Sequence, residues 1–153
     1  MKVLITGATG TIGGAMYRHC LQHPAITSIV TLTRRPFLSS DPKSSNIVVS
    51  DFKIWPAEIL SQIADADAII WALGSSDANE DTNYNYILAF QEAFRRVMPV
   101  TRANRFRYIL LSGALVEPDQ DKRLYLLSAA RTVSYTHLRA PRDGLLSRMP
   151  SSA

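Results

Sequence analysis

Three glycines spaced three residues apart near the N-terminus constrain the fold of this chain more than any other feature. They lie in Thr6-Gly7-Ala8-Thr9-Gly10-Thr11-Ile12-Gly13, between an apolar run fit for a buried strand (2–6) and a helical pattern (11–23) that Pro24 ends. In such a strand–turn–helix unit, the first glycine allows a tight turn. The second lets the backbone approach a pyrophosphate, and the third lets the helix pack closely on the strand.

The same segment predicts where phosphates would bind. The first amide groups of a helix have no acceptor within the helix, and the helix dipole places positive charge there. The alternative is a glycine-rich turn that binds nothing. On the first interpretation, the residues expected to contact a dinucleotide are Gly7, Thr9, Gly10, Thr11, Ile12 and Gly13.

Apolar runs alternate with helical patterns over residues 1–112, which is typical of βαβ units. Strands are expected at 2–6, 28–33, 46–50, 67–72 and 107–112, and helices at 11–23, from Pro56, and from Thr82 to near Pro99. We therefore predict an α/β fold, a Rossmann-like three-layer sandwich. Its parallel sheet would have about five strands in the order 3-2-1-4-5, with right-handed crossovers.

The end of the second strand predicts the type of dinucleotide. A carboxylate there favours NAD by accepting from the ribose 2′-OH, whereas arginine accommodates a 2′-phosphate. The sequence has Thr33-Arg34-Arg35-Pro36, with no acidic residue between Gly13 and Asp41. We expect NADP(H) to be preferred, with NAD(H) as the other possibility and Arg34 as the main phosphate partner beside Arg35. The alternative is two solvated arginines.

Two further segments follow strands at the edge of the sheet where the cofactor would bind. Asp51 and Phe52 are candidates for contact with the adenine, by hydrogen bond and ring packing, although Asp51 could equally be a turn or cap residue. Ala72-Leu73-Gly74 follows the fourth strand, where small residues let the backbone pass close to a dinucleotide.

Composition and charge exclude several other classes. The single cysteine, Cys20, excludes a disulfide framework, and the three histidines have no partner at metal-ligand spacing, so no metal is expected. No apolar run approaches the ~20 residues that span a bilayer, and no secretory signal is visible, so we expect a cytoplasmic protein with no membrane partner.

The net charge of +4 is carried largely by residues 131–153. A basic cluster lies elsewhere, at Arg95, Arg96, Arg102, Arg105 and Arg107. It is interpreted as a solvated helix end and loop, and no nucleic-acid partner is expected. A nucleic-acid binder would instead show strongly salt-dependent affinity.

These motifs together resemble the short-chain dehydrogenase/reductase superfamily. The resemblance rests on the glycine segment, Asp51, Ala72-Leu73-Gly74 and Leu111-Ser112-Gly113, and it covers roughly residues 1–131. With Asn83-Tyr84-Asn85-Tyr86 opening the long helix, the chain is more similar to the atypical NAD(P)H-binding group. That group includes the nitrogen-metabolite-repression-regulator-like proteins and small epimerase-like relatives. The resemblance implies an NAD(P)-binding domain at 1–131 and hydride transfer on a small carbonyl or sugar-like substrate.

The resemblance also exposes a missing motif. Active members use a serine near the end of the fifth strand and Tyr-x-x-x-Lys on the next helix. Here Ser112 and Tyr125 are the candidate catalytic residues, and core or loop roles are the alternative for both. Ala129 stands four residues after Tyr125, and no Tyr-x-x-x-Lys occurs in the sequence. An inactive chain from an enzyme therefore competes with a non-catalytic dinucleotide-binding module that senses redox state or regulates a partner.

Residues 132–153 follow neither a sustained period nor a helix cap. This segment resembles translated sequencing-adapter read-through. We expect the native reading frame to be lost near residues 132–134, which leaves a C-terminally truncated domain with a non-native or disordered tail. The alternative is a natural, divergent tail.

Overall fold

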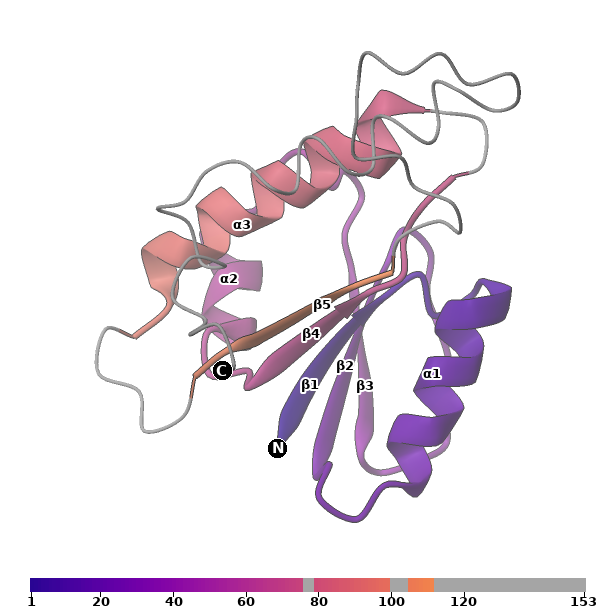
Figure 1. Cartoon of the computed structure of the whole chain (residues 1–153). Coiled ribbons are helices and arrows are strands. Elements are labelled where there is room, and N and C mark those ends of the chain that lie inside the picture. Colours follow the sequence, from indigo (N-terminus) through magenta and orange to yellow (C-terminus); the bar gives the residue numbers. More distant parts are fainter. Residues whose placement is uncertain (76–78, 100–104, 112–153) are drawn as a thin grey trace, which may run out of the picture.

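A computed structural model describes residues 1–75, 79–99 and 105–111. Within them β1 (Lys2–Thr6) leads into α1 (Thr11–Gln22), followed by β2 (Ser28–Thr33) and β3 (Ser44–Val48). Then come α2 (Ala57–Ile63), β4 (Ala68–Trp71), the π-helical turn η1 (Asp81–Asn85), α3 (Tyr86–Val97) and β5 (Arg107–Leu110). Figure 1 shows the strands fanned side by side, with all five pointing in one direction.

The five strands form one sheet in the order β3-β2-β1-β4-β5, and every neighbouring pair is parallel. Val3 of β1 lies between Ile29 of β2 and Ala68 of β4, so β1 is the central strand. The strand order reverses there, because the chain extends outward from β1 to β3 and then returns to its other side at β4. The predicted fold class and strand order are confirmed.

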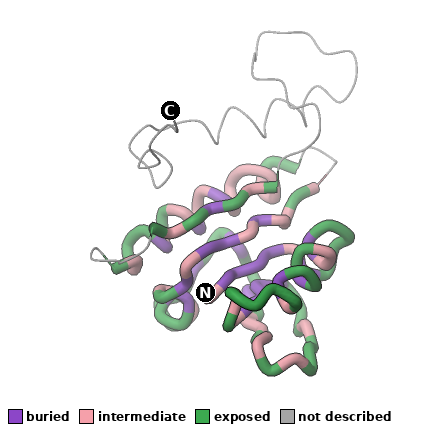
Figure 2. Tube along the Cα trace, turned by 60° about the horizontal axis from the view of Figure 1, so that its bottom comes forward, coloured by how far each residue is buried: buried purple, intermediate pink, exposed green. Residues whose placement is uncertain are grey.

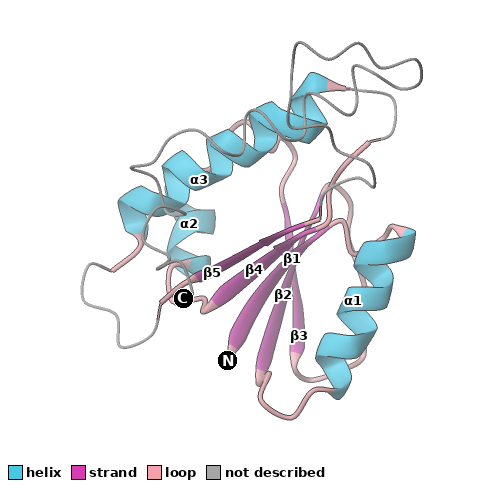
Figure 3. Ribbon diagram, in the orientation of Figure 1, coloured by secondary structure: helices cyan, strands magenta, loops and turns pink. Residues whose placement is uncertain are grey.

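Helices cover the sheet on both faces, which gives three layers (Figure 3). On one face α1 packs on a small core that includes Val3, Ile5 and Ile29. On the other, α2 and α3 enclose a larger aromatic core around Trp71 and Phe90. Figure 2 shows burial concentrated in the strands, with exposed residues on the outer helix surfaces. This two-sided covering is what buried parallel strands require.

The sequence prediction places β3 two residues too far along the chain. The strand was expected at 46–50 but runs Ser44–Val48, because Ser44 and Ser45 pair with Ile29 and Val30 of β2. An edge strand tolerates polar residues, so its first two positions carry no apolar signal. The long helix also differs, since the residues from Asp81 to Asn85 form η1 before α3 begins at Tyr86.

None of the helices in the described part of the chain is long and apolar enough to cross a membrane.

Candidate functional site

The turn after β1 has a geometry that only glycine accommodates. Gly7 has φ of +70°, and a Cβ there would lie 2.5 Å from the carbonyl oxygen of Ala72. A Cβ on Gly13 would lie 2.1 Å from the carbonyl oxygen of Gly7. The turn is therefore pressed between the end of β4 and the first turn of α1, as the motif predicts for its first and third glycines.

A buried hydroxyl fixes the end of β4 against this turn. The Thr6 Oγ1 atom accepts hydrogen bonds from the backbone amides of Ala72 and Leu73, both at 3.2 Å, and Thr6 is fully buried. Sequence reasoning missed this role. The only available signal was the position of Thr6, which is the last residue of β1 and precedes Gly7.

Some amide groups at the start of α1 form no hydrogen bond to the residues that the structure describes. The Gly10 amide donates to Gly7 O at 2.9 Å and the Gly14 amide to Gly10 O at 2.8 Å. Among the described residues, no acceptor is found for the amides of Thr11, Ile12 and Gly13, and no side chain caps the helix. Such an end attracts an anion through its unpaired N–H groups and the helix dipole.

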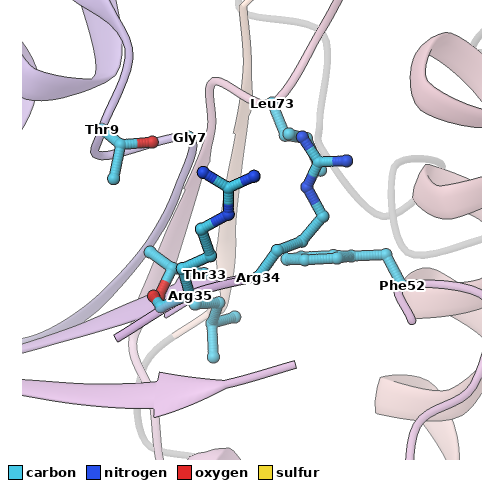
Figure 4. A pocket seen from close by; sticks show the side chains of 8 residues that line it. Gly7, Thr9, Thr33, Arg34, Arg35, Phe52 and Leu73 are labelled. Carbon is cyan, nitrogen blue, oxygen red and sulfur yellow. The ribbon is translucent and has the colours of Figure 1, made fainter. Parts of the chain in front are cut away.

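Two arginines stand at the end of β2, across from the glycine turn. Arg34 and Arg35 are both exposed, and in the described segments neither forms an ion pair with an acidic side chain. Figure 4 shows both guanidinium groups extending into the space bordered by Thr9 and Leu73. The turn after β2 thus brings two positive charges to the site that no acidic side chain in the described residues neutralises.

Phe52 forms the wall of the site opposite α1. Its ring is 1% exposed and packs edge-to-face on Trp55 and Trp71, with ring centroids 5.6 and 6.0 Å apart. Phe52 is therefore mainly a core residue that presents only a small part of its surface to the site.

The glycine turn, the two arginines and Phe52 border one cavity of about 260 Å³. It lies beyond the carboxyl ends of β1, β2 and β4, where the strand order reverses, and this is the usual ligand position in open parallel sheets. The cavity is lined by Gly7, Thr9, Leu32, Thr33, Arg34, Arg35, Phe52 and Leu73 (Figure 4).

Six of the candidate binding residues line this cavity, and seven do not. The six are Gly7, Thr9, Arg34, Arg35, Phe52 and Leu73. The others in the described chain are Gly10, Thr11, Ile12, Gly13, Asp51, Ala72 and Gly74. Asp51 forms a local hydrogen bond, in which its Oδ1 accepts from the Lys53 amide at 2.9 Å. This is in keeping with its alternative role in a turn. Ser112 and Tyr125 lie outside the described residues.

Two asparagines that sequence reasoning did not single out for binding hold the loops beside the cavity. Asn83 of η1 accepts from the Ser75 amide at 2.8 Å and donates to its carbonyl at 2.9 Å, which ties down the segment after β4. Asn46 of β3 bonds to the β2 end, at Thr31 and Thr33. Asn83 lies in the Asn83-Tyr84-Asn85-Tyr86 motif, but neither hydrogen-bonding role could be read from the sequence, since both depend on which segments are neighbours in space.

Other chemistry is less well supported in the described residues. Burial raises the pKa of the Tyr108 phenol, which keeps it neutral and unsuited to proton transfer. Burial likewise raises the pKa of the Cys20 thiol. Among the residues that the structure describes, no group of three or more His, Cys, Asp or Glu side chains could hold a metal ion.

A five-stranded parallel sheet of this order, with a glycine turn leading into α1 and a cavity at the strand ends, defines the Rossmann-like class of α/β domains. The description of the family whose model matches residues 3–138 is NAD dependent epimerase/dehydratase family. The chain therefore belongs to that family. This assignment confirms the resemblance to epimerase-like short-chain dehydrogenases/reductases found in the sequence.

One curated protein and several solved structures are also similar to this chain. Protein FMP52, mitochondrial, of Candida albicans is 35% identical over 88 residues, which is 56% of this chain and 38% of the relative. The oxidoreductase ylbE of Lactococcus lactis superposes with a TM-score of 0.65 at 20% identity, over 90% of this chain and 59% of the other. The dTDP-glucose 4,6-dehydratase of Bacillus anthracis, solved in complex with NAD, gives 0.59 at 15% identity, over 87% and 48%.

The two structural likenesses show the fold alone. This chain spans between 38 and 59% of the length of these three proteins.

Proposed function

We propose that this domain binds NADP(H) in preference to NAD(H), across the carboxyl ends of β1, β2 and β4. The observation that carries the proposal is the pair Arg34 and Arg35, which line the same cavity as Gly7 and have no acidic partner within the described residues. A 2′-phosphate would neutralise the positive charge of the two guanidinium groups, whereas an uncharged ribose 2′-OH would not.

The residues present fit the rest of such a cofactor. The amides of Thr11, Ile12 and Gly13, for which the described residues offer no acceptor, would hold the pyrophosphate, and Gly7 adds no side chain to the turn. Phe52 and Leu73 would border the adenine on its apolar faces. Asp51 remains a proposed hydrogen-bond partner for the adenine through its second carboxylate oxygen.

Titration calorimetry with NADPH and with NADH tests the proposal. We expect NADPH to bind more tightly, and Arg34→Ala to weaken NADPH binding about 10- to 100-fold, the loss that follows from removing a charge-assisted hydrogen bond. NADH affinity should change far less. The matched control is Arg95→Ala, which removes an exposed arginine from the last turn of α3, away from the residues that line the cavity. Equal affinities, or tighter NADH binding by the wild type, would contradict the proposal.

For the intact protein we propose an oxidoreductase or epimerase-like enzyme acting on a small carbonyl or sugar-like substrate. The nicotinamide would supply the hydride, and the protein would bind and orient it. Ser112 and Tyr125 remain the proposed catalytic residues of this domain, which we place at 1–131. Oxidation of NADPH by the full-length protein with a panel of aldehydes, ketones and nucleotide sugars tests this activity.

A non-catalytic module is the second candidate, and one sequence feature favours it. None of the six tyrosines is followed four residues later by a lysine. Such a module would bind NADPH with the same selectivity but would not consume it with any carbonyl compound. A full-length protein with turnover would contradict this candidate.

The remaining proposals concern the location of the protein in the cell, its partners and its C-terminal segment. We keep a cytoplasmic location, although the relative FMP52 is named as mitochondrial, and fluorescence microscopy of a tagged protein tests it. We also keep the absence of a nucleic-acid partner, which salt-dependent retention on DNA or RNA would contradict. Resequencing across codons 132–134 tests whether residues 132–153 are native.

A further inference from the structure

The turn that carries Arg34 and Arg35 has little secondary structure of its own. It leaves β2 at Thr33, and the chain re-enters the sheet only at Ser44. A mobile turn would have to be ordered when a phosphate binds, and that ordering lowers affinity. What fixes the turn in the free protein therefore bears directly on how well the arginines recognise a ligand.

The side chain of Asn46, on β3, forms hydrogen bonds to residues before and after the two arginines of the turn. Its Nδ2 atom donates to Thr31 O at 3.0 Å and to Thr33 Oγ1 at 2.7 Å, and its Oδ1 accepts from the Phe37 amide at 3.0 Å. The orientation of the amide follows from these partners, because a carbonyl can only accept and a backbone N–H can only donate. Asn46 thus joins the residue before the two arginines to the chain just after them.

Thr33 connects the Asn46 side chain to the backbone of Arg35. The Asn46 amide nitrogen can only donate, so the Thr33 hydroxyl accepts from it and has its own proton free for another bond. That proton goes to the carbonyl oxygen of Arg35, at 2.7 Å. Asn46, Thr33 and Arg35 therefore form a chain of hydrogen bonds in which each link fixes the direction of the next.

The far side of the same loop is tied to α1. The Tyr17 hydroxyl lies 2.6 Å from Ser39 Oγ and 2.8 Å from Ser44 Oγ, and the Tyr17 and Phe37 rings pack edge-to-face with centroids 5.1 Å apart. The N-terminus of α1 also supplies the amides of the phosphate-binding end. The contacts of Tyr17 therefore fix the position of the loop relative to those amides.

We propose that Asn46 is a positioning residue for recognition of the 2′-phosphate: through Thr33 it holds the Arg34–Arg35 turn in its binding geometry before the ligand arrives. The inference rests on the proposed preference for NADP(H) and goes beyond it, because Asn46 lies on β3 and is not among the residues lining the cavity. Its effect is confined to the part of the ligand in which NADPH differs from NADH.

The test compares dissociation constants for NADPH and NADH in the wild type and in two variants. Asn46→Leu removes the amide while keeping the number and branching of the side-chain heavy atoms, and Thr33→Val removes the linking hydroxyl while keeping the β-branched shape. In each variant we expect the affinity ratio of NADPH to NADH to fall about 3- to 10-fold, the change that one net hydrogen bond produces.

Two matched variants control for the strand and for the hydroxyl. Ser45→Ala removes a 3.4 Å hydrogen bond to Ile29 O from the same strand, and the ratio should not change. Thr33→Ser restores the hydroxyl and should restore most of the ratio. Thr33→Val also keeps the inference testable if Asn46→Leu fails to fold.

The outcomes separate the two proposals. A wild type without preference for NADPH overturns both. A preference that survives in Asn46→Leu and Thr33→Val overturns only the role of Asn46. Equal losses for NADPH and NADH also overturn it, because they show a general structural effect. A ratio that falls in both variants, and recovers in Thr33→Ser, supports it.

Discussion

Two glycines show how narrowly single residues determine this site. Gly7 lies against the carbonyl oxygen of Ala72 and Gly13 against that of Gly7, and neither position leaves room for a methyl group. The same close contact that excludes side chains brings the start of α1 directly behind the turn. The glycines therefore shape the anion-binding end of the helix by allowing two backbone segments to touch.

Gly13→Ala should destabilise the domain by about 1–3 kcal/mol, because the new Cβ would lie 2.1 Å from Gly7 O and the helix would have to move away. Denaturant unfolding followed by circular dichroism measures this change. Gly14→Ala is the matched control, since its Cβ would lie 3.2 Å from the nearest atom and the helix gains propensity. Equal stability of the two variants would contradict the steric explanation.

At the scale of elements, an ion pair joins the loop after β3 to the turn η1. Lys53 Nζ lies 2.7 Å from Asp81 Oδ2, and Asp81 Oδ1 accepts from Asn85 at 2.8 Å. The two charged side chains are 47% and 41% exposed, so the pair orients two connecting segments more than it stabilises the fold. The pKa of Asp81 is lowered, first by the hydrogen bond from Lys53 and then by that from Asn85.

Lys53→Met should make the domain slightly less stable near neutral pH. The lowered pKa of Asp81 means that its contribution is present above the unfolded value of about 4 and is lost as the pH falls through the folded value. The difference in urea midpoint between wild type and variant should therefore shrink as the pH is lowered below about 4. A difference that stays constant across that range would show that Lys53 acts through something other than this ion pair.

At the scale of the whole molecule, the parallel arrangement collects the site from segments far apart in sequence. The ends of β1, β2 and β4 contribute Gly7, Thr33 and the turn to Leu73, and all reach one cavity because parallel strands end at the same edge. Binding at that cavity would therefore hold three separate strand ends together.

NADPH at about 100 times its dissociation constant should stabilise the native state by about 2.7 kcal/mol, if it binds only the folded domain. For a chain of this length, this corresponds to a rise of roughly 5–10 °C in the melting temperature. Differential scanning calorimetry over a series of NADPH concentrations measures it. A melting temperature that does not depend on concentration would contradict binding at the cavity.

The sequence predicted the strands well where burial demands an apolar run, as at Ile69 and its neighbours in β4. It failed at Ser44 and Ser45, which pair at the sheet edge without an apolar signal. The glycine turn was predictable because its chemistry is local. The bonds of Asn46 were not, since they depend on the register between β2 and β3, which no short motif encodes.

The aromatic packing behind Phe52 has a practical consequence. The chain contains two tryptophans, Trp55 and Trp71, and both pack against the ring that borders the cavity. All of the intrinsic indole emission therefore originates next to the candidate binding site. Quenching or energy transfer to a reduced nicotinamide would report occupancy optically, without a label, and a shift in the emission maximum would reveal any repacking of Phe52.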